Sequence, residues 1–188
     1  ALGRAAGGSE DGENSWKQFH KPQRVGKRLV IRPSWEAFAA SEDDLVLTID
    51  PGGAFGSGGD ETTRVCLRLL EPAVCPGDRV LDMGCGSGVL SIAALLLGAR
   101  AALGVDIDKA AVHTAADNAR LNGVGDRFES RWGNALTDRA FAVSLGLGYD
   151  LLCANIVADV HLSLREFYYD KLRPGGALLL SGIIEEIG

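Results

Sequence analysis

The sequence predicts an α/β fold in which a doubly wound, mostly parallel sheet follows a short N-terminal extension with strands of its own. From Arg79 onward, short apolar runs alternate with longer stretches of helical periodicity, which is typical of parallel strands joined by helical crossovers. A length of 188 residues with 46% hydrophobic side chains suffices for one core of ordinary size. We therefore expect a single globular domain with smaller appendages.

The first third of the chain divides into a tail and an extension. Residues 1–14 are rich in Gly, Ala and charge and lack an apolar period, so they are expected to be a flexible tail or linker remnant. Because no initiator Met is present, we expect a piece cut from a longer protein. Residues 15–59 are expected to form the extension, with short strands at 27–32 and 45–49 and then a glycine-rich loop. Residues 60–188 are assigned to the main domain.

The main domain is expected to contain five strands. Its first helix spans 61–74, where apolar side chains recur at helical spacing until Pro72 interferes. The signal RPGG is expected to stop the last helix. Strands are expected at 79–84, 101–108, 128–134, 149–156 and 177–184, and further helices at 87–98, 109–123 and 157–172.

In such a sheet, ligands bind beyond the carboxyl ends of the strands, where the strand order reverses. The chemistry is therefore expected at residues 82–87, which include Asp82, and at Asp106 and Asn155.

Composition restricts the partners. A net charge of −6 and a pI near 5.1 oppose nonspecific attraction to phosphate backbones, so no direct nucleic acid binding is expected. An acidic surface would favour a basic partner, although a moderately acidic pI is also ordinary for cytosolic proteins. No secretory signal and no apolar stretch of roughly 20 residues is apparent, so we expect no membrane association and a cytoplasmic location.

The cysteines and histidines do not predict a metal site. No two cysteines form a C-x-x-C pair, and the three histidines are scattered along the chain. All four cysteines have apolar or glycine neighbours and are expected to be reduced core residues: Cys66, Cys75, Cys85 and Cys153.

The segment LDMGCGSG at 81–88 predicts a tight turn between a strand and a helix. Gly84, Gly86 and Gly88 would let the chain turn sharply and let a ligand approach backbone N–H groups. A dinucleotide fingerprint would need its third glycine at Val89, so a nicotinamide cofactor is disfavoured. The observed spacing is the one that methyltransferases use, although tight packing of strand and helix alone would also favour glycine.

Asp106 is a candidate ligand for the ribose of an adenosyl group. It ends the second strand of the main domain, 22 residues after Gly84, where a carboxylate can accept hydrogen bonds from both ribose hydroxyls. The alternative is that Asp106 or Asp108 only caps the helix that begins near Lys109. We expect Asp108 to cap and Asp106 to bind.

Two further polar sites lie at element ends. Thr62 and Thr63 open a helix whose free N–H groups and hydroxyls could meet a carboxylate, although capping would also explain them. The glycine-rich loop before them has no Lys ahead of the hydroxyl residue, so it is not a Walker-type nucleotide site.

Asn155 ends the fourth strand. Its amide could orient a nucleophile, or could instead be hydrogen-bonded to loop backbone.

Four motifs together resemble the ribosomal protein methyltransferase A family, bacterial enzymes that methylate the eleventh protein of the large ribosomal subunit. The resemblance extends from Trp16 to Glu185, including VGKRLVIRPSWE. The motifs are DPGGAFGSGGDETTR, LDMGCGSGVLSIAALLLGA, GVDID and CANIVADV, in that order.

The resemblance implies a Rossmann-like class I methyltransferase that uses S-adenosylmethionine and releases S-adenosylhomocysteine. It also implies a basic ribosomal protein as substrate, methylated on lysine side chains and an N-terminal amine. Residues at matching motif positions are implied as cofactor contacts: Thr63, Gly84, Asp106 and Asn155, with Phe55 and Asn134 as further pocket residues.

The sequence departs from the family pattern in three respects. Asp60 replaces the usual His of the glycine-rich loop, no segment has the length of the family's N-terminal substrate domain, and the last two strands of the sheet are expected to be missing. Alternatives are therefore an enzyme of the same fold acting on another protein or a small amine, and a noncatalytic cofactor-binding domain.

Overall fold

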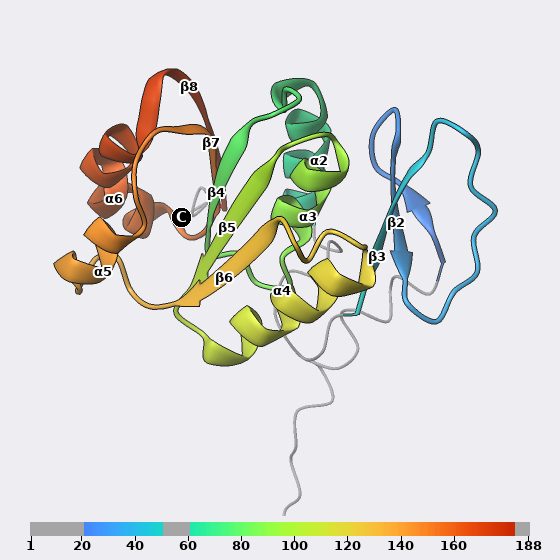
Figure 1. Cartoon of the computed structure of the whole chain (residues 1–188), viewed down its shortest axis with the longest axis horizontal. Helices are drawn as coiled ribbons and strands as arrows, with labels where there is room; N and C mark the ends of the chain where they lie inside the picture. Colours follow the sequence, from blue (N-terminus) through green and yellow to red (C-terminus); the bar gives the residue numbers. More distant parts are fainter. Residues whose placement is uncertain (1–20, 51–60, 183–188) are drawn as a thin grey trace, which may run out of the picture.

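The computed structural model describes residues 21–50 and 61–182, which form two sheets with five helices around the larger one (Figure 1). The larger sheet has five parallel strands in the order β6-β5-β4-β7-β8. Its strands are β4 Arg79–Met83, β5 Ala101–Asp106, β6 Phe128–Trp132, β7 Tyr149–Asn155 and β8 Leu172–Ser181. The chain proceeds outward from β4 through β5 and β6, and then continues on the other side of β4. This confirms the expected doubly wound, parallel sheet of five strands.

The helices agree with the expected periodicity except in one place. They are α2 Glu61–Ala73, α3 Val89–Leu96, α4 Lys109–Leu121, α5 Arg139–Ser144 and α6 Ala158–Lys171. The short helix α5 was not anticipated, although Asp138 caps it by accepting a hydrogen bond from the Phe141 N–H. Pro72 lies inside α2 rather than beyond its end, in the last turn.

The last helix ends before the RPGG segment, as expected, because α6 ends at Lys171, but the strand that follows begins earlier than the expected residue 177. Strand β8 begins directly after α6, at Leu172, and so includes all four residues. The pairing of β8 with β7 shifts register between Tyr149 and Leu151, so the RPGG segment is an irregular part of the strand.

Alternating side chains of the central strands supply two cores. Val80, Leu151 and Cys153 pack on the face that α2 and α3 cover, while Leu81 and Leu152 pack on the face of α6. Since both faces of the sheet are covered, its strands read as nearly continuous apolar runs.

The N-terminal extension forms the smaller sheet, which lies away from α5 and α6 in Figure 1. Its strands are β1 Gln23–Arg24, β2 Leu29–Pro33 and β3 Leu45–Ile49, with β2 antiparallel to β1 and parallel to β3. The expected strands at 27–32 and 45–49 thus correspond to β2 and β3. The proposed tail and the proposed boundary at residue 59 lie outside the described residues.

The smaller sheet is attached to the main domain by apolar and polar contacts. Leu29 and Leu47 belong to the same buried cluster as the side chains of α2 and α3. The Glu71 carboxylate of α2 accepts hydrogen bonds of 2.7 Å from the N–H groups of both Lys27 and Arg28.

The cysteine expectation is wrong at one position. Cys66, Cys85 and Cys153 are buried, whereas Cys75 is exposed, because it lies in the turn between α2 and β4. All four are free thiols. Within the described ranges, no group of three or more His, Cys, Asp or Glu residues is arranged to hold a metal ion. No helix in the described part of the chain is long and apolar enough to cross a membrane.

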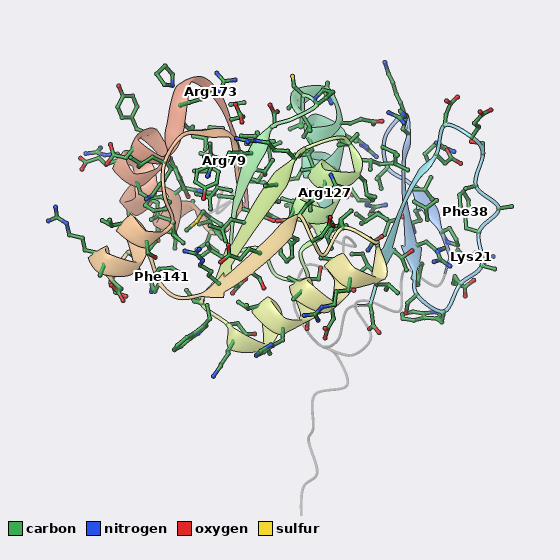
Figure 2. All side chains as sticks on the ribbon, in the orientation of Figure 1. Lys21, Phe38, Arg79, Arg127, Phe141 and Arg173 are labelled. Atoms are coloured by element: carbon green, nitrogen blue, oxygen red, sulfur yellow. The ribbon has the colours of Figure 1, made fainter. Side chains whose placement is uncertain are left out.

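The side chain of Asp150 joins three strands of the larger sheet near their amino ends. The Asp150 carboxylate of β7 accepts hydrogen bonds from the Arg79 N–H of β4 and from the Arg173 guanidinium of β8. Arg79 and Arg173 are labelled in Figure 2. These hydrogen bonds, that from Arg173 foremost, hold the pKa of Asp150 below its usual value. The amino ends of the strands are opposite to the edge where a ligand is expected.

We expect Leu152→Ala to lower the free energy of unfolding by about 2–5 kcal/mol, because the side chain is fully buried between the sheet and α6. Leu162→Ala is the control, since Leu162 is 72% exposed on α6, and its effect should stay within about 0.5 kcal/mol. Urea denaturation measures both. Equal effects of the two substitutions would contradict the core assignment.

Candidate functional site

A cavity of about 560 Å³ lies at the carboxyl ends of the central strands, where a doubly wound sheet binds ligands. Its wall combines the turn after β4, the end of β5, the loop after β6, the end of β7 and the first turn of α2. It is lined by Thr62, Thr63, Asp82, Met83, Gly84, Cys85, Gly86, Val89, Leu90, Val105, Asp106, Ile107, Gly133, Asn134, Ala135, Leu136, Asn155, Ile156, Val157, Val160, Leu164 and Gly182. Seven of the predicted site residues are in this wall, namely Thr63, Asp82, Gly84, Gly86, Asp106, Asn134 and Asn155, whereas Ser87 and Gly88 of the predicted turn do not line it. Phe55 and Asp60 lie outside the described residues.

The glycine turn is shaped by backbone conformation and close approach. Gly84, Gly86 and Gly88 all have positive φ, between 53° and 82°. Residues with a side chain rarely adopt this backbone conformation. A Cβ at Gly84 would also lie 2.4 Å from the Ile156 side chain. Glycine at this position therefore lets the turn after β4 touch the segment after β7.

The turn does not offer its N–H groups as the sequence had suggested. The N–H groups of Gly84 and Cys85 both donate to the Val105 carbonyl, and the Gly86 N–H donates to Asp106. These donors are used inside the fold, so the contribution of the glycines is space for a ligand rather than hydrogen bonds to it.

Asp106 and Asp108 divide the two roles considered for them. Asp108 caps α4, because its side chain accepts a 2.8 Å hydrogen bond from the Ala110 N–H, as expected. Asp106 caps no helix. Its two carboxylate oxygens accept hydrogen bonds of 2.9 Å from the N–H groups of Gly86 and Asp108. These bonds fix its carboxylate in the cavity wall.

Thr63 and Asn155 meet across the cavity wall although 92 positions separate them. Helix α2 begins at Glu61 and places both threonines in its first turn, with Thr63 buried. The Asn155 amide donates a 3.2 Å hydrogen bond to the Thr63 hydroxyl. Among the described residues, the partner of this amide nitrogen is therefore a side chain from the other end of the site.

Asp82 is a buried acid in the floor of the cavity. Only 1% of its surface is exposed, and Ser91 donates to its Oδ2 through both its hydroxyl, at 2.7 Å, and its N–H, at 3.2 Å. Oδ1 is buried and has no hydrogen-bond partner among the described residues. Burial raises the pKa of Asp82 from 3.8 to about 6, against the Ser91 bonds that lower it, and repulsion from Asp106 adds a smaller rise.

Asn134 lines the cavity and shapes the loop after β6. Its side-chain oxygen accepts a 2.9 Å hydrogen bond from the Leu136 N–H, which closes a turn. This bond presents Ala135 and Leu136 as an apolar part of the wall.

Sequence reasoning did not identify most of the apolar wall. Ile107 is 70% exposed and Val157 63% exposed, yet both line the cavity, and such apolar exposure at a concave site is typical of ligand binding. A signal was available for each, because Ile107 directly follows Asp106 and Val157 lies two residues after Asn155.

Comparison with known proteins identifies one family. The family model described as ribosomal protein L11 methyltransferase (PrmA) matches residues 5–187. The chain is 49% identical over 177 residues to a ribosomal protein L11 methyltransferase of Pelotomaculum thermopropionicum, covering 94% of this chain and 56% of that protein. The corresponding protein of Heliobacterium modesticaldum is 48% identical over 176 residues, covering 94% and 54%. The chain thus spans about half the length of the curated relatives it matches.

One solved structure agrees with this family, and a second is similar in fold. A ribosomal protein L11 methylase from Lactobacillus delbrueckii subsp. bulgaricus matches with a TM-score of 0.76 and 32% identity, over 86% of this chain and 80% of that one. An RNA methyltransferase from Salinibacter ruber in complex with S-adenosyl-L-homocysteine matches with a TM-score of 0.54 and 28% identity, over 62% and 72%.

The raised pKa of Asp82 predicts a pH dependence of stability. In the folded chain the pKa of Asp82 is about 6, which is above the ordinary value of 3.8 that the side chain has in the unfolded chain. Its contribution to stability is therefore most favourable below about pH 4 and is lost as the pH rises through about 6. Asp82→Asn lacks this titration. We expect the free energy of unfolding of the unmodified chain, relative to that of Asp82→Asn, to fall by about 2 kcal/mol from about pH 4 to pH 7. Urea denaturation measures this difference, and a constant difference would contradict the assignment.

Proposed function

The chain belongs to the ribosomal protein L11 methyltransferase family, and from this membership we propose that it transfers methyl groups from S-adenosylmethionine to amines of a ribosomal protein. The observation that supports this most directly is that the glycine turn, Asp106, Thr63 and Asn155 come together in one cavity from four separate motifs. Its volume of about 560 Å³ is in the range of small-molecule sites.

The residues present fit this cofactor. The carboxylate of Asp106, held by two backbone N–H groups, would accept hydrogen bonds from the ribose hydroxyls. The Oδ1 of Asp82, which has no partner among the described residues, would accept a hydrogen bond from the methionine ammonium, which would also compensate its burial. Gly84 and Gly86 would admit the cofactor closely, and Asn134 with its apolar neighbours would border the adenine.

The proposed chemistry depends on positioning. Bound S-adenosylmethionine supplies a methyl group on a sulfonium, which a neutral amine can attack in line. A lysine amine has a pKa of about 10.4, so a buried site must favour its uncharged form. Asn155 is the residue proposed to aim this amine. Its amide nitrogen is held by Thr63, so its carboxamide oxygen is the atom that would accept an amine hydrogen.

The proposed substrate is a basic protein of the large ribosomal subunit. A net charge of −6 favours such a partner over free nucleic acid, and a ribosomal substrate would place the reaction in the cytoplasm. Another protein or a small amine is the alternative acceptor, and methylation assays with purified ribosomal proteins distinguish these classes.

Asp106→Ala tests the cofactor site. We expect calorimetric titration with S-adenosylhomocysteine to show binding by the unmodified chain and a loss of affinity of at least about 30-fold in the variant, because hydrogen bonds to a carboxylate contribute about 1.5–3 kcal/mol each. Asp108→Ala is the control, since it should cost about 1 kcal/mol of stability as a lost cap and leave the affinity near that of the unmodified chain. Binding unaffected by Asp106→Ala would refute the assignment.

Asn155→Ala tests the positioning of the amine. In the full-length enzyme with its ribosomal protein substrate, we expect kcat to fall by about 10- to 100-fold, because a misaligned amine reacts slowly. The rate of methyl transfer at saturating cofactor is the measurement. Full turnover together with unchanged cofactor affinity would show that Asn155 has no such role.

A further inference from the structure

We propose that Asn118 of α4 is a positioning residue that fixes the glycine turn of the cofactor site relative to the small sheet. This inference rests on the proposed function for its link to cofactor affinity. Asn118 does not line the cavity. It is nevertheless among the most buried polar residues of the chain, with 1% of its surface exposed.

Asn118 of α4 and Asn122, which caps the C-terminus of that helix, take the place of a neighbouring strand along β3 and Asp50, the residue that follows it. The Asn122 side chain accepts a hydrogen bond from the Thr48 N–H, at 2.8 Å, and donates one to the Thr48 carbonyl, at 2.6 Å. The Asn118 side chain makes the same pair of bonds with the N–H and carbonyl of Asp50, both at 2.9 Å. The small sheet is therefore joined to α4 by paired amide contacts of the kind that join strands.

The spacing explains how a helix can do this. Residues four apart on a helix lie about 6 Å apart along one face, and residues two apart on a strand lie about 6.7 Å apart with their N–H and C=O groups on the same side. Asn118 and Asn122 are four apart, while Thr48 and Asp50 are two apart. One helical turn thus matches one repeat of the strand.

Asn118 differs from Asn122 in its third contact. The Asn118 amide nitrogen also donates a 3.0 Å hydrogen bond to the carbonyl of Ser87, in the glycine turn. The Asn122 amide nitrogen instead donates to the Asn118 carbonyl within α4, at 2.8 Å. Of the two asparagines, Asn118 is therefore the one that connects the small sheet with the turn.

Ser87 is a position where such a contact controls the site. It lies between Gly86, whose N–H is bound by Asp106, and Gly88, which precedes α3 with a φ of +82°. Since glycine conformations are permissive, the turn needs external bonds to hold one arrangement. Asp106 supplies one such bond from the cavity side, and Asn118 supplies another from the side of α4.

The two asparagines provide a matched pair for the test. The amide nitrogen of each asparagine donates hydrogen bonds to two carbonyl oxygens. Asn118→Asp and Asn122→Asp each replace this nitrogen by a carboxylate oxygen, which cannot donate and faces the same two carbonyl oxygens. Both variants are expected to lower the midpoint of thermal unfolding. Asn118→Ala, which removes the donors without adding charge, replaces Asn118→Asp if the latter does not fold.

The first measurement is calorimetric titration with S-adenosylhomocysteine at a temperature at which every variant is folded. We expect the Kd to rise by about tenfold or more in the Asn118 variants and to stay within about twofold in Asn122→Asp. If Asn118 had only a structural role, the Kd of the Asn118 variants and the Kd of Asn122→Asp would each rise in proportion to the stability that the variant loses. Equal effects on Kd in the two variants, or an unchanged Kd in the Asn118 variants, would overturn the proposal.

The second measurement is hydrogen–deuterium exchange of the unliganded protein, which is independent of the cofactor. The N–H groups of Gly86 and Gly88 should exchange faster in the Asn118 variants than in Asn122→Asp. Unchanged exchange in the turn would overturn the positioning role whatever the cofactor affinity. Failure of the unmodified chain to bind S-adenosylhomocysteine would instead count against the proposed function, while the exchange data would still decide the role of Asn118.

Discussion

The carboxylate of Asp106 holds the site together. Its two oxygens accept hydrogen bonds from Gly86, in the turn after β4, and from Asp108, where the chain enters α4. These bonds tie the carboxyl ends of two adjacent parallel strands to the start of the following helices. The same turn is then approached by Ile156 at Gly84 and by Asn118 at Ser87. The cavity is therefore bounded by one glycine-rich turn on which three separate segments converge.

Asp82 shows that the site is not arranged for stability alone. A fully buried carboxyl whose Oδ1 has no partner among the described residues is unfavourable, and its raised pKa expresses this cost. Such a group is typical of a binding site, where a ligand supplies the missing partner. Because most of the surrounding wall is apolar, a cationic or donor group placed beside Asp82 would interact with it strongly.

The sequence alone determined the order and type of most elements and named polar residues that line the cavity. Alternating apolar runs predicted five strands, and the glycine spacing at 84–88 placed a turn where the structure has one. The assignment of Asp108 as a cap was correct, because capping depends on residues within one turn of a helix. These features are local, and they follow from periodicity, turn chemistry and side-chain hydrogen bonding that short segments already specify.

Only the tertiary structure decided how these segments use each other. It showed that the N–H groups of the glycine turn are bonded internally, that Cys75 is exposed, and that Asn155 contacts Thr63 from 92 positions away. It also revealed Asn118, which in the sequence is one of many polar residues of an amphipathic helix. None of these could be predicted from local pattern, because each depends on which backbone and side-chain groups distant segments place within about 3 Å of each other after the sheet has formed.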